Sequence, residues 1–326
     1  MTQTAGEKSS DYVPDKIQAK VNRVQLRPFG KRGLLWREAV DGWLFILPWL
    51  FGFLIFTAGP MLASAVLSFM EWEILTPASW VGLANFRQML RDPLFYKSLY
   101  NTAYYSFLGV PLYLIASLMM ALLLNMPVRG TSIYRTFFFI PSLTPAVANA
   151  LLWTWIFSPD FGLANYFLQT VGLPPQKWLF DVNLAKPSLI LMGLWGIGSQ
   201  MIIFLAGLQG IPQTLYEAAS IDGANHLQRF WSITLPMLSP TIFFNLVIGV
   251  IGSFQVFTTA FIATQGGPQN ATLFYVLYLW RNGFDYFKMG YGSALAWVLF
   301  VIVLILTLIQ FRVARYFVYY EVDEAV

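Results

Sequence analysis

The sequence lacks the residues from which most polar active sites are built. It has no cysteine and one histidine, His226, so neither a disulfide framework nor a cysteine- or histidine-based metal site is expected. Charged residues make up 11% of the 326 residues, against about 25% in an average soluble domain. Hydrophobic residues make up 57%, and the mean hydropathy is +0.59. This composition indicates an integral membrane protein.

Six long apolar runs contain no Asp, Glu, Lys or Arg. A helix needs about 20 residues to cross a hydrocarbon layer about 30 Å thick, and each run is long enough. Backbone polar groups in lipid must pair within the segment, and no alternating strand pattern is present, so the runs predict helices. We therefore expect an all-α membrane protein with six transmembrane helices. The predicted spans are residues 43–69, 99–124, 136–157, 188–209, 240–263 and 291–311.

Basic residues concentrate at the N-terminus. Residues 1–42 carry eight of the 20 Lys and Arg residues, and no apolar run begins before Trp43, so a cleavable signal peptide is not expected. Basic residues beside a span favour the cytoplasmic side. We predict a polar cytoplasmic tail over 1–42, a transmembrane domain over 43–326, and both termini in the cytoplasm. Without the tail, the inner loops hold 5 basic residues and the outer loops 7, so this orientation depends on the tail.

Two local patterns leave alternatives open. Prolines such as Pro141 and Pro145 lie within the predicted spans; they can serve as packing kinks or as hinges between two transport states. The sequence Gly-Leu-Ala-Asn-aromatic occurs at 82–86, after the first span, and again at 162–166, after the third. Chance is a fair explanation for so short a repeat.

A polar segment, residues 216–236, separates the fourth and fifth predicted spans. Pro212 can begin a short helix because its missing N–H costs nothing in the first turn. Gly223 permits a left-handed turn, Asn225 can cap a second short helix, and Pro236 limits continuation of that helix. An amphipathic connector without a function of its own is the plain alternative.

This segment resembles the EAA loop of ABC importer permeases. The spacing is carried by Glu217, Ala218, Ala219, Gly223, Ile233, Leu235 and Pro236. Trp80–Phe86, Gly266-Gly267-Pro268 and the run from Gly290 to Ala296 also resemble the carbohydrate-uptake subgroup, so the likeness covers nearly all of the chain after residue 40. Within the subgroup the chain is similar to the MalF-like or UgpA-like subunit of these binding-protein-dependent inner-membrane components. It lacks the extra N-terminal spans and large periplasmic insert of the maltose protein, which argues against a maltose assignment.

The resemblance implies the type I importer (MetI-like) permease architecture, with a cytoplasmic coupling-helix loop. Glu217 would make the charged contact with a separate ATPase, Ala218 and Ala219 would pack in its groove, and Gly223 would make the turn. The implied partners are an ABC ATPase dimer, a second, MalG-like permease subunit, an extracytoplasmic substrate-binding protein and membrane lipid, in a bacterial or archaeal inner membrane. Scattered basic residues give no indication of nucleic-acid binding.

No nucleotide site is visible in the sequence, because the G-x-x-x-x-G-K-[ST] phosphate loop is missing. We therefore expect no enzyme activity and no cofactor on this chain, with ATP and Mg bound by the partner ATPase.

The resemblance also implies import of a sugar, oligosaccharide or polyol derivative. By analogy with the family's sugar pocket, the candidate path residues are Trp195, Gly196, Ser199, Ser253 and Gln255. Amides and hydroxyls could meet sugar hydroxyls, and an aromatic ring could meet a sugar face. The alternative for each polar residue is an interhelical hydrogen bond, worth about 0.6 kcal/mol on average.

Two other functions fit this sequence less well. An ion-coupled secondary transporter of a small polar solute usually holds ionisable groups within the membrane, and these spans have none. An intramembrane enzyme would need a buried catalytic group, which the spans also lack. Glycerol 3-phosphate or another non-sugar remains open as a substrate.

Overall fold

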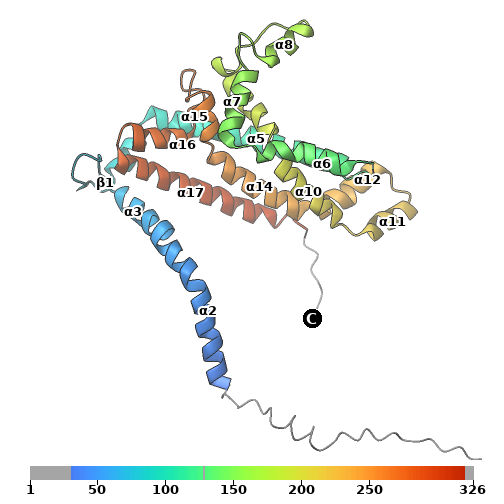
Figure 1. Cartoon of the computed structure of the whole chain (residues 1–326), viewed down its shortest axis with the longest axis horizontal. Helices are drawn as coiled ribbons and strands as arrows, with labels where there is room; N and C mark the ends of the chain where they lie inside the picture. The colour runs from blue at the N-terminus through green and yellow to red at the C-terminus, as the bar shows by residue number, and fades with distance from the viewer. Residues whose placement is uncertain (1–30, 128, 320–326) are drawn as a thin grey trace, which may run out of the picture. The chain divides into compact units, whose positions relative to one another are not determined.

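The computed structural model describes residues 31–127 and 129–319 (Figure 1). These residues form helices and one two-stranded hairpin, and they divide into two units, Met1–Ala63 and Ser64–Val326. Residues 1–30, most of the expected tail, lie outside the described residues.

The first unit is a single helical rod in its described part. It consists of α2 (Lys31–Phe53), the π-helical turn η1 (Leu54–Ala58) and the beginning of α3 (Gly59–Leu67). Residues 31–42 are therefore helical. The stretch Glu38–Leu67 is long and apolar enough to cross a membrane, and a helix that is apolar all round is typical of a span. In the π-turn, the Gly59 N–H donates to the Leu54 carbonyl, immediately before Pro60, which has no N–H to give.

The second unit contains the remaining elements. In chain order they are β1 (Met70–Glu71), β2 (Ser79–Trp80), α4 (Ala84–Met89), α5 (Pro93–Leu124), α6 (Thr131–Phe139), η2 (Ile140–Leu143), α7 (Ala146–Ile156), α8 (Leu163–Thr170), η3 (Trp178–Phe180), α9 (Ala185–Leu194), α10 (Gly198–Gln209), α11 (Gln213–Ile221), α12 (His226–Arg229), η4 (Phe230–Thr234), α13 (Leu235–Met237), α14 (Ser239–Phe254), α15 (Thr258–Ala263), α16 (Tyr275–Trp280), η5 (Arg281–Asp285) and α17 (Met289–Ala314).

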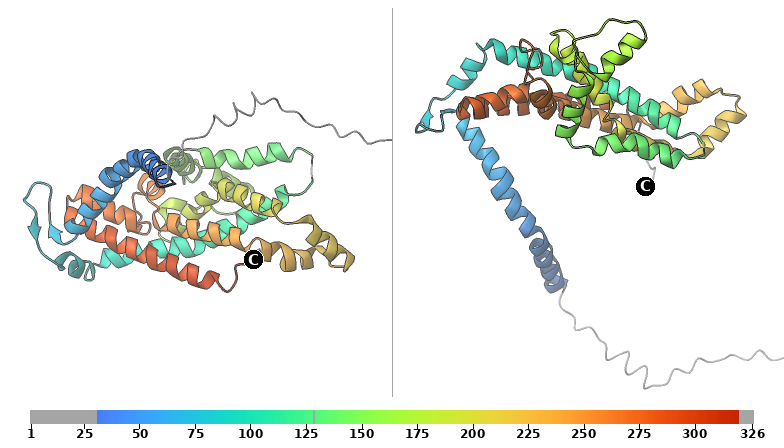
Figure 2. Two further views of the ribbon diagram at one scale, coloured as in Figure 1. Left: turned by 90° about the horizontal axis from the view of Figure 1, so that it is seen from below. Right: turned by 45° about the horizontal axis from the view of Figure 1, so that its top comes forward.

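Helix α5 is the central element of this unit, because it packs against α9, α10, α14 and α16. Its first half contributes Phe95 and Tyr105 to one buried apolar cluster, with residues of α16 and α17. Its last turns contribute Ala121 and Leu124 to a second cluster, with residues of α10. The β1–β2 hairpin lies at one end of the unit and the pair α11–α12 at the other, in all three views (Figures 1 and 2).

The predicted fold class, an all-α membrane protein, is confirmed. Three helical stretches are long and apolar enough to span a membrane as they stand, and the number rises to six if each of three bent helix pairs is one span. The bent pairs are Thr131–Leu143 with Ala146–Ile156, Ala185–Leu194 with Gly198–Gln209, and His226–Met237 with Ser239–Phe254.

Three predicted spans are interrupted rather than continuous. The span at 136–157 bends by 98° between η2 and α7, and the span at 188–209 bends by 48° between α9 and α10. The span at 240–263 ends its helix at Phe254 and resumes as the short α15 after Gln255. The prolines at 141 and 145 flank the first bend; the second has no proline within it.

The repeated Gly-Leu-Ala-Asn pattern has a common structural role. Asn85 and Asn165 are both buried, and each side-chain amide donates to two backbone carbonyls of an irregular segment. For Asn85 these are the carbonyls of Ser68 and Met70, at 2.9 Å each. For Asn165 they belong to Pro159 and Gln176, at 3.0 and 2.9 Å. The two copies therefore fix two loops by the same bonding pattern.

Asp92 links three helices at the hairpin end of the unit. Its Oδ1 accepts from the Leu94 N–H at 2.9 Å, which caps α5. Its Oδ2 accepts from the Tyr291 hydroxyl of α17 at 2.8 Å and from the Tyr278 hydroxyl of α16. Burial, and then the bond to Asp92, raise the pKa of Tyr278 to about 12, so this hydroxyl remains a donor at physiological pH.

We predict that Asp92→Ala destabilises the protein by about 2–4 kcal/mol, because it removes a helix cap and two hydrogen bonds to a charged acceptor. The readout is the thermal midpoint of the detergent-solubilised chain at a fixed heating rate. Asp160→Ala is the matched control, since Asp160 is an exposed carboxylate in the loop between α7 and α8. Equal midpoints for the two variants would contradict the linking role of Asp92.

Candidate functional site

The polar segment between α10 and α14 contains two short helices, α11 and α12, joined by a tight turn. Helix α11 ends in a Schellman motif: the Ala224 N–H donates to the Ala219 carbonyl at 2.9 Å, and the Gly223 N–H donates to the Ser220 carbonyl at 3.2 Å. Gly223 has φ +77°, a left-handed conformation in which side-chain-bearing residues are strained. The turn expected at Gly223 is therefore confirmed.

The second helix begins with the expected cap at Asn225. Its side-chain oxygen accepts from the Gln228 N–H at 2.9 Å, and the Gln228 side chain accepts from the Asn225 N–H at 2.8 Å, which is a complete capping box. The Arg229 Nε also donates to the Ala224 carbonyl at 2.8 Å. Hydrogen bonds thus fix both sides of the turn, and they stabilise the angle between α11 and α12.

The helix ends one residue after Pro236, the residue expected to limit its continuation. It continues through the π-turn η4 and α13 to Met237, and the chain bends by 62° only before α14. In the π-turn the Leu235 N–H donates to the Phe230 carbonyl. A π-turn directly before a proline gives the chain an extra residue per turn, so the helix accommodates the missing N–H of Pro236.

The seven coupling candidates form two groups. Glu217, Ala218 and Gly223 are exposed, and Ala219 is half-buried. Ile233, Leu235 and Pro236 are half-buried, and Ile233 packs against the apolar cluster of α5 and α10. A hydrogen bond of 2.9 Å between the Tyr216 and Thr234 hydroxyls joins the two arms. The first group can therefore contact a partner, while the second anchors the loop.

Sequence reasoning missed three large apolar side chains on this pair. Ile221, Leu227 and Trp231 are 87%, 67% and 60% exposed. Their position could have been noticed in the sequence, because large apolar residues are unexpected inside the polar segment 216–236. Exposed apolar residues gathered on one projection are typical of a protein or membrane contact.

The path candidates lie at two helix breaks. Trp195 and Gly196 occupy the bend between α9 and α10, Ser199 follows it, and Gln255 ends α14. All four are exposed, and the Trp195 ring meets Trp153 edge-on at 6.1 Å. Within the described residues, the Ser199 and Gln255 side chains make no hydrogen bond, so they are available to a solute.

Ser253 differs from the other path candidates. It is 7% exposed, and its hydroxyl donates to Ser106 Oγ of α5 at 2.6 Å. This pairing supplies an interhelical contact and leaves the hydroxyl enclosed.

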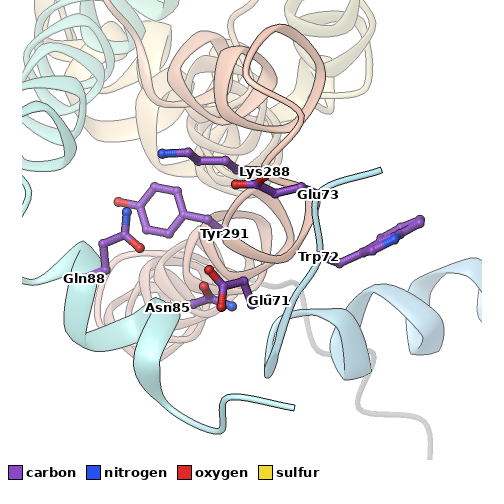
Figure 3. Close-up of a pocket in the computed structure, with 7 residues that line it drawn as sticks. All are labelled: Glu71, Trp72, Glu73, Asn85, Gln88, Lys288 and Tyr291. Atoms are coloured by element: carbon purple, nitrogen blue, oxygen red, sulfur yellow. The ribbon is translucent and has the colours of Figure 1, made fainter. Parts of the chain in front are cut away.

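A polar cavity of about 100 Å³ lies at the end of the unit opposite the helix pair (Figure 3). It is lined by Glu71, Trp72, Glu73, Asn85, Gln88, Lys288 and Tyr291. Figure 3 shows residues from α4 and from the start of α17 converging there, with the Trp72 ring turned away. The backbone bridge between Glu73 and Lys288 closes one side. A Cβ at Gly290 would collide with the Met70 carbonyl, so this glycine allows the hairpin to approach α17.

Interrupted apolar helices beside a polar helix pair are typical of membrane transport proteins. Comparison with known proteins gives the family. Residues 113–318 match the family described as "Binding-protein-dependent transport system inner membrane component". The chain belongs to this family of ABC transporter permeases.

Relatives and a solved structure agree with this assignment. The chain is 46% identical to the probable ABC transporter permease protein YesP of Bacillus subtilis, over 88% of this chain and 94% of the relative. It is 34% identical to the arabinooligosaccharides transport system permease protein AraP of the same organism, over 88% and 93%. A crystal structure of a bacterial alginate ABC transporter, in complex with an alginate pentasaccharide-bound periplasmic protein, has a chain of TM-score 0.76 and 25% identity, covering 86% of this chain and 97% of that one.

Family membership decides between the functions left open by the sequence. The chain is a multi-pass inner-membrane permease subunit and not itself catalytic, and nucleotide binds to the ATPase subunit of such a transporter. An ion-driven carrier and an intramembrane enzyme are thereby set aside.

We predict that Asn225→Ala loosens α12 without unfolding the protein, because loss of the cap costs about 1 kcal/mol locally. Amide hydrogen exchange should accelerate about fivefold in a peptide covering residues 222–232. Asn225→Asp, which retains the acceptor oxygen, should exchange like the wild type. Unchanged exchange in Asn225→Ala would show that the turn does not depend on its capping box.

Proposed function

We propose that this chain forms half of the membrane pathway of a saccharide importer and receives its driving force through the helix pair α11–α12. The observation that carries the proposal is the fixed geometry of that pair. Gly223 and Asn225 lock the angle between the helices, while Glu217 and Ala218 remain exposed. A projection that keeps its shape can pass a displacement of its partner to the helices at its base.

The partner at this projection is an ABC ATPase dimer. Ala218 offers no bulk, so a backbone of the partner can approach closely, and Glu217 supplies a charge for a basic or N–H-rich contact. Ile221, Leu227 and Trp231 add apolar area around that contact. Exposed charge alone contributes little to affinity, so the apolar residues supply most of the contact's stability.

The substrate is a sugar or oligosaccharide. Trp195 offers an aromatic face, and Ser199 and Gln255 offer hydroxyl and amide groups, which together suit an uncharged polyhydroxy solute. Gly196 leaves room beside the Trp195 ring. Relatives named for arabinooligosaccharides and alginate support this substrate class.

Completion of the pathway requires a second, MalG-like permease subunit, and delivery of substrate requires an external binding protein. The alginate transporter structure contains a periplasmic protein, in agreement with such delivery. Basic residues in the N-terminal tail favour a cytoplasmic location for both termini. The Glu71–Tyr291 cavity would then lie on the outer surface, where the binding protein arrives.

The first test is to purify the tagged chain from gently solubilised membranes and identify the proteins that come with it. Recovery of an ATPase and a second six-span protein would support the proposal. Recovery of the chain alone, together with uptake by vesicles that lack ATP, would refute it.

We predict that Glu217→Lys reduces both ATPase recovery and ATP-driven uptake at least tenfold, because it reverses the charge at the contact while leaving membrane insertion intact. Uptake is measured in cells lacking the native copy, and insertion by the amount of chain in the membrane fraction. Asp160→Lys, the same charge change on an exposed loop outside α11–α12, should behave like the wild type. Full uptake by Glu217→Lys would remove the coupling role.

We predict that Gln255→Leu raises the half-saturating substrate concentration about five- to tenfold. The substitution removes the hydrogen bonds between the Gln255 amide and the substrate, each worth about 1 kcal/mol. ATPase recovery should not change. Ser253→Ala is the contrasting variant: loss of its bond to Ser106 should lower thermal stability rather than alter half-saturation. An equal shift of the half-saturating concentration in the two variants would contradict a direct contact between Gln255 and the substrate.

A further inference from the structure

Lys186 has an unusual environment near the start of α9. Its Nζ donates to the Asn101 Oδ1 of α5 at 3.1 Å. It also lies 4.8 Å from the ring centroid of Tyr100 and 4.7 Å from that of Tyr104. An ammonium has three N–H donors, so one hydrogen bond leaves two donors for another acceptor.

The amide that holds Lys186 cannot turn away. Asn101 is fully buried, and its Nδ2 donates to the carbonyls of Asn270 and Leu273 at 2.9 and 3.1 Å. Both amide hydrogens are thereby used, so the Oδ1 must face the ammonium. This oxygen carries only a partial negative charge, and it orients Lys186 without neutralising it.

No full negative charge compensates Lys186 among the described residues, since none of their carboxylates forms an ion pair with it. Asp181 lies five residues earlier, but its Oδ1 accepts from the N–H groups of Asn183 and Leu184. Asp92, at the start of α5, is bonded to Tyr278 and Tyr291. Lys97 carries the same charge and repels Lys186.

A lysine that only anchors a span in the membrane surface extends its ammonium toward the headgroups. Lys186 instead lies over two tyrosine rings, of which Tyr100 is 59% exposed. Cation–π contacts of this kind stabilise the position of the charge but leave it able to attract an anion.

The location of Lys186 fits the entrance of a pathway. Helix α9 leads through the bend at Trp195 into α10, and α10 leads to the coupling pair α11–α12. Lys186 is therefore at the far end of this span from the ATPase contact, which is the side from which an importer receives substrate.

We propose that Lys186, assisted by Tyr100 and Tyr104, binds the carboxylate of an acidic saccharide at the outer mouth, so that the substrates are oligosaccharides containing uronic acids. This inference rests on the proposed saccharide importer. The free ammonium donors meet the carboxylate, and the exposed ring of Tyr100 meets the sugar ring. The fold itself accepts such cargo, since a structural relative of TM-score 0.77 takes part in import of the acidic polysaccharide alginate.

The test uses cells in which the tagged chain replaces the native copy, with its partner subunits present. The probes are trigalacturonate and trimannuronate, each paired with its neutral methyl ester. We expect the wild type to favour the acids and Lys186→Gln to lower the acid-to-ester ratio of initial uptake rates about tenfold, the effect of losing one charge-assisted hydrogen bond. Lys186→Arg should retain most of the ratio.

Lys177→Gln is the matched control, because Lys177 is an exposed lysine of the preceding loop and its removal should leave the ratio unchanged. A purely structural role for Lys186 would lower both uptake rates together and leave the ratio unchanged, which overturns the proposal. A wild type that takes up only the esters, or none of the acids, also overturns it.

Two further arms separate the possible sources of failure. If Lys186→Gln keeps the ratio but loses a bound phosphatidylglycerol in native mass spectrometry, the anion is a lipid headgroup and the proposal is wrong. If Glu217→Lys still takes up the probes, the coupling in the proposed function fails, whatever the acid-to-ester ratio shows.

Discussion

Backbone N–H and C=O groups have no water to bind in a membrane core, so every interruption of a helix must find polar partners within the protein. The break between α9 and α10 shows how this is met. The Tyr113 hydroxyl of α5 donates to the Ile190 carbonyl at 3.0 Å, close to where the regular helix ends. The N-terminus of α16 also finds a partner on α5: the N–H of Tyr275, its first residue, donates to the Thr102 hydroxyl at 2.9 Å. Helix α5 thus supplies side-chain partners for backbone groups of α9 and of the first turn of α16.

This constraint separates two kinds of polar residue in the spans. Asn101, Asn245 and Ser253 are buried and bonded within the protein, so their polarity serves the fold. Ser199 and Gln255 are exposed at helix breaks and make no such bond in the described part of the chain. Exposure and bonding, rather than polarity alone, therefore identify the groups that can meet a solute. By this criterion Lys186 is intermediate, because one donor is used and two are free.

The sequence was sufficient to predict the features that depend on neighbouring residues. Composition predicted a helical membrane protein, and the positions of Gly223 and Asn225 predicted a turn followed by a capped helix. Pro141 and Pro145 indicated a kink where the first bend lies, but the bend between α9 and α10 has no such local signal, because distant contacts determine it. A Cβ at Gly198 would collide with the Phe138 carbonyl, and one at Gly193 with the Tyr113 ring, so the course of α9 and α10 depends on close approach to α6 and α5. No local pattern distinguishes such glycines from others, and the same holds for Lys186, whose two tyrosines belong to another helix.

The positions of the breaks relative to the helix pair α11–α12 bear on how motion could pass through the subunit. Helices α10 and α14 are about 18 Å and 24 Å long at 1.5 Å per residue, over 12 and 16 residues. One end of each helix adjoins the segment that contains α11 and α12. The other end is a helix break, at Trp195 for α10 and at Gln255 for α14. Because hydrogen bonds fix the loop at Gly223 and Asn225, a displacement there would be carried along both helices rather than absorbed in the turn. The breaks at Trp195 and Gln255 are then the compliant points, which is where a change of shape would open or close a path.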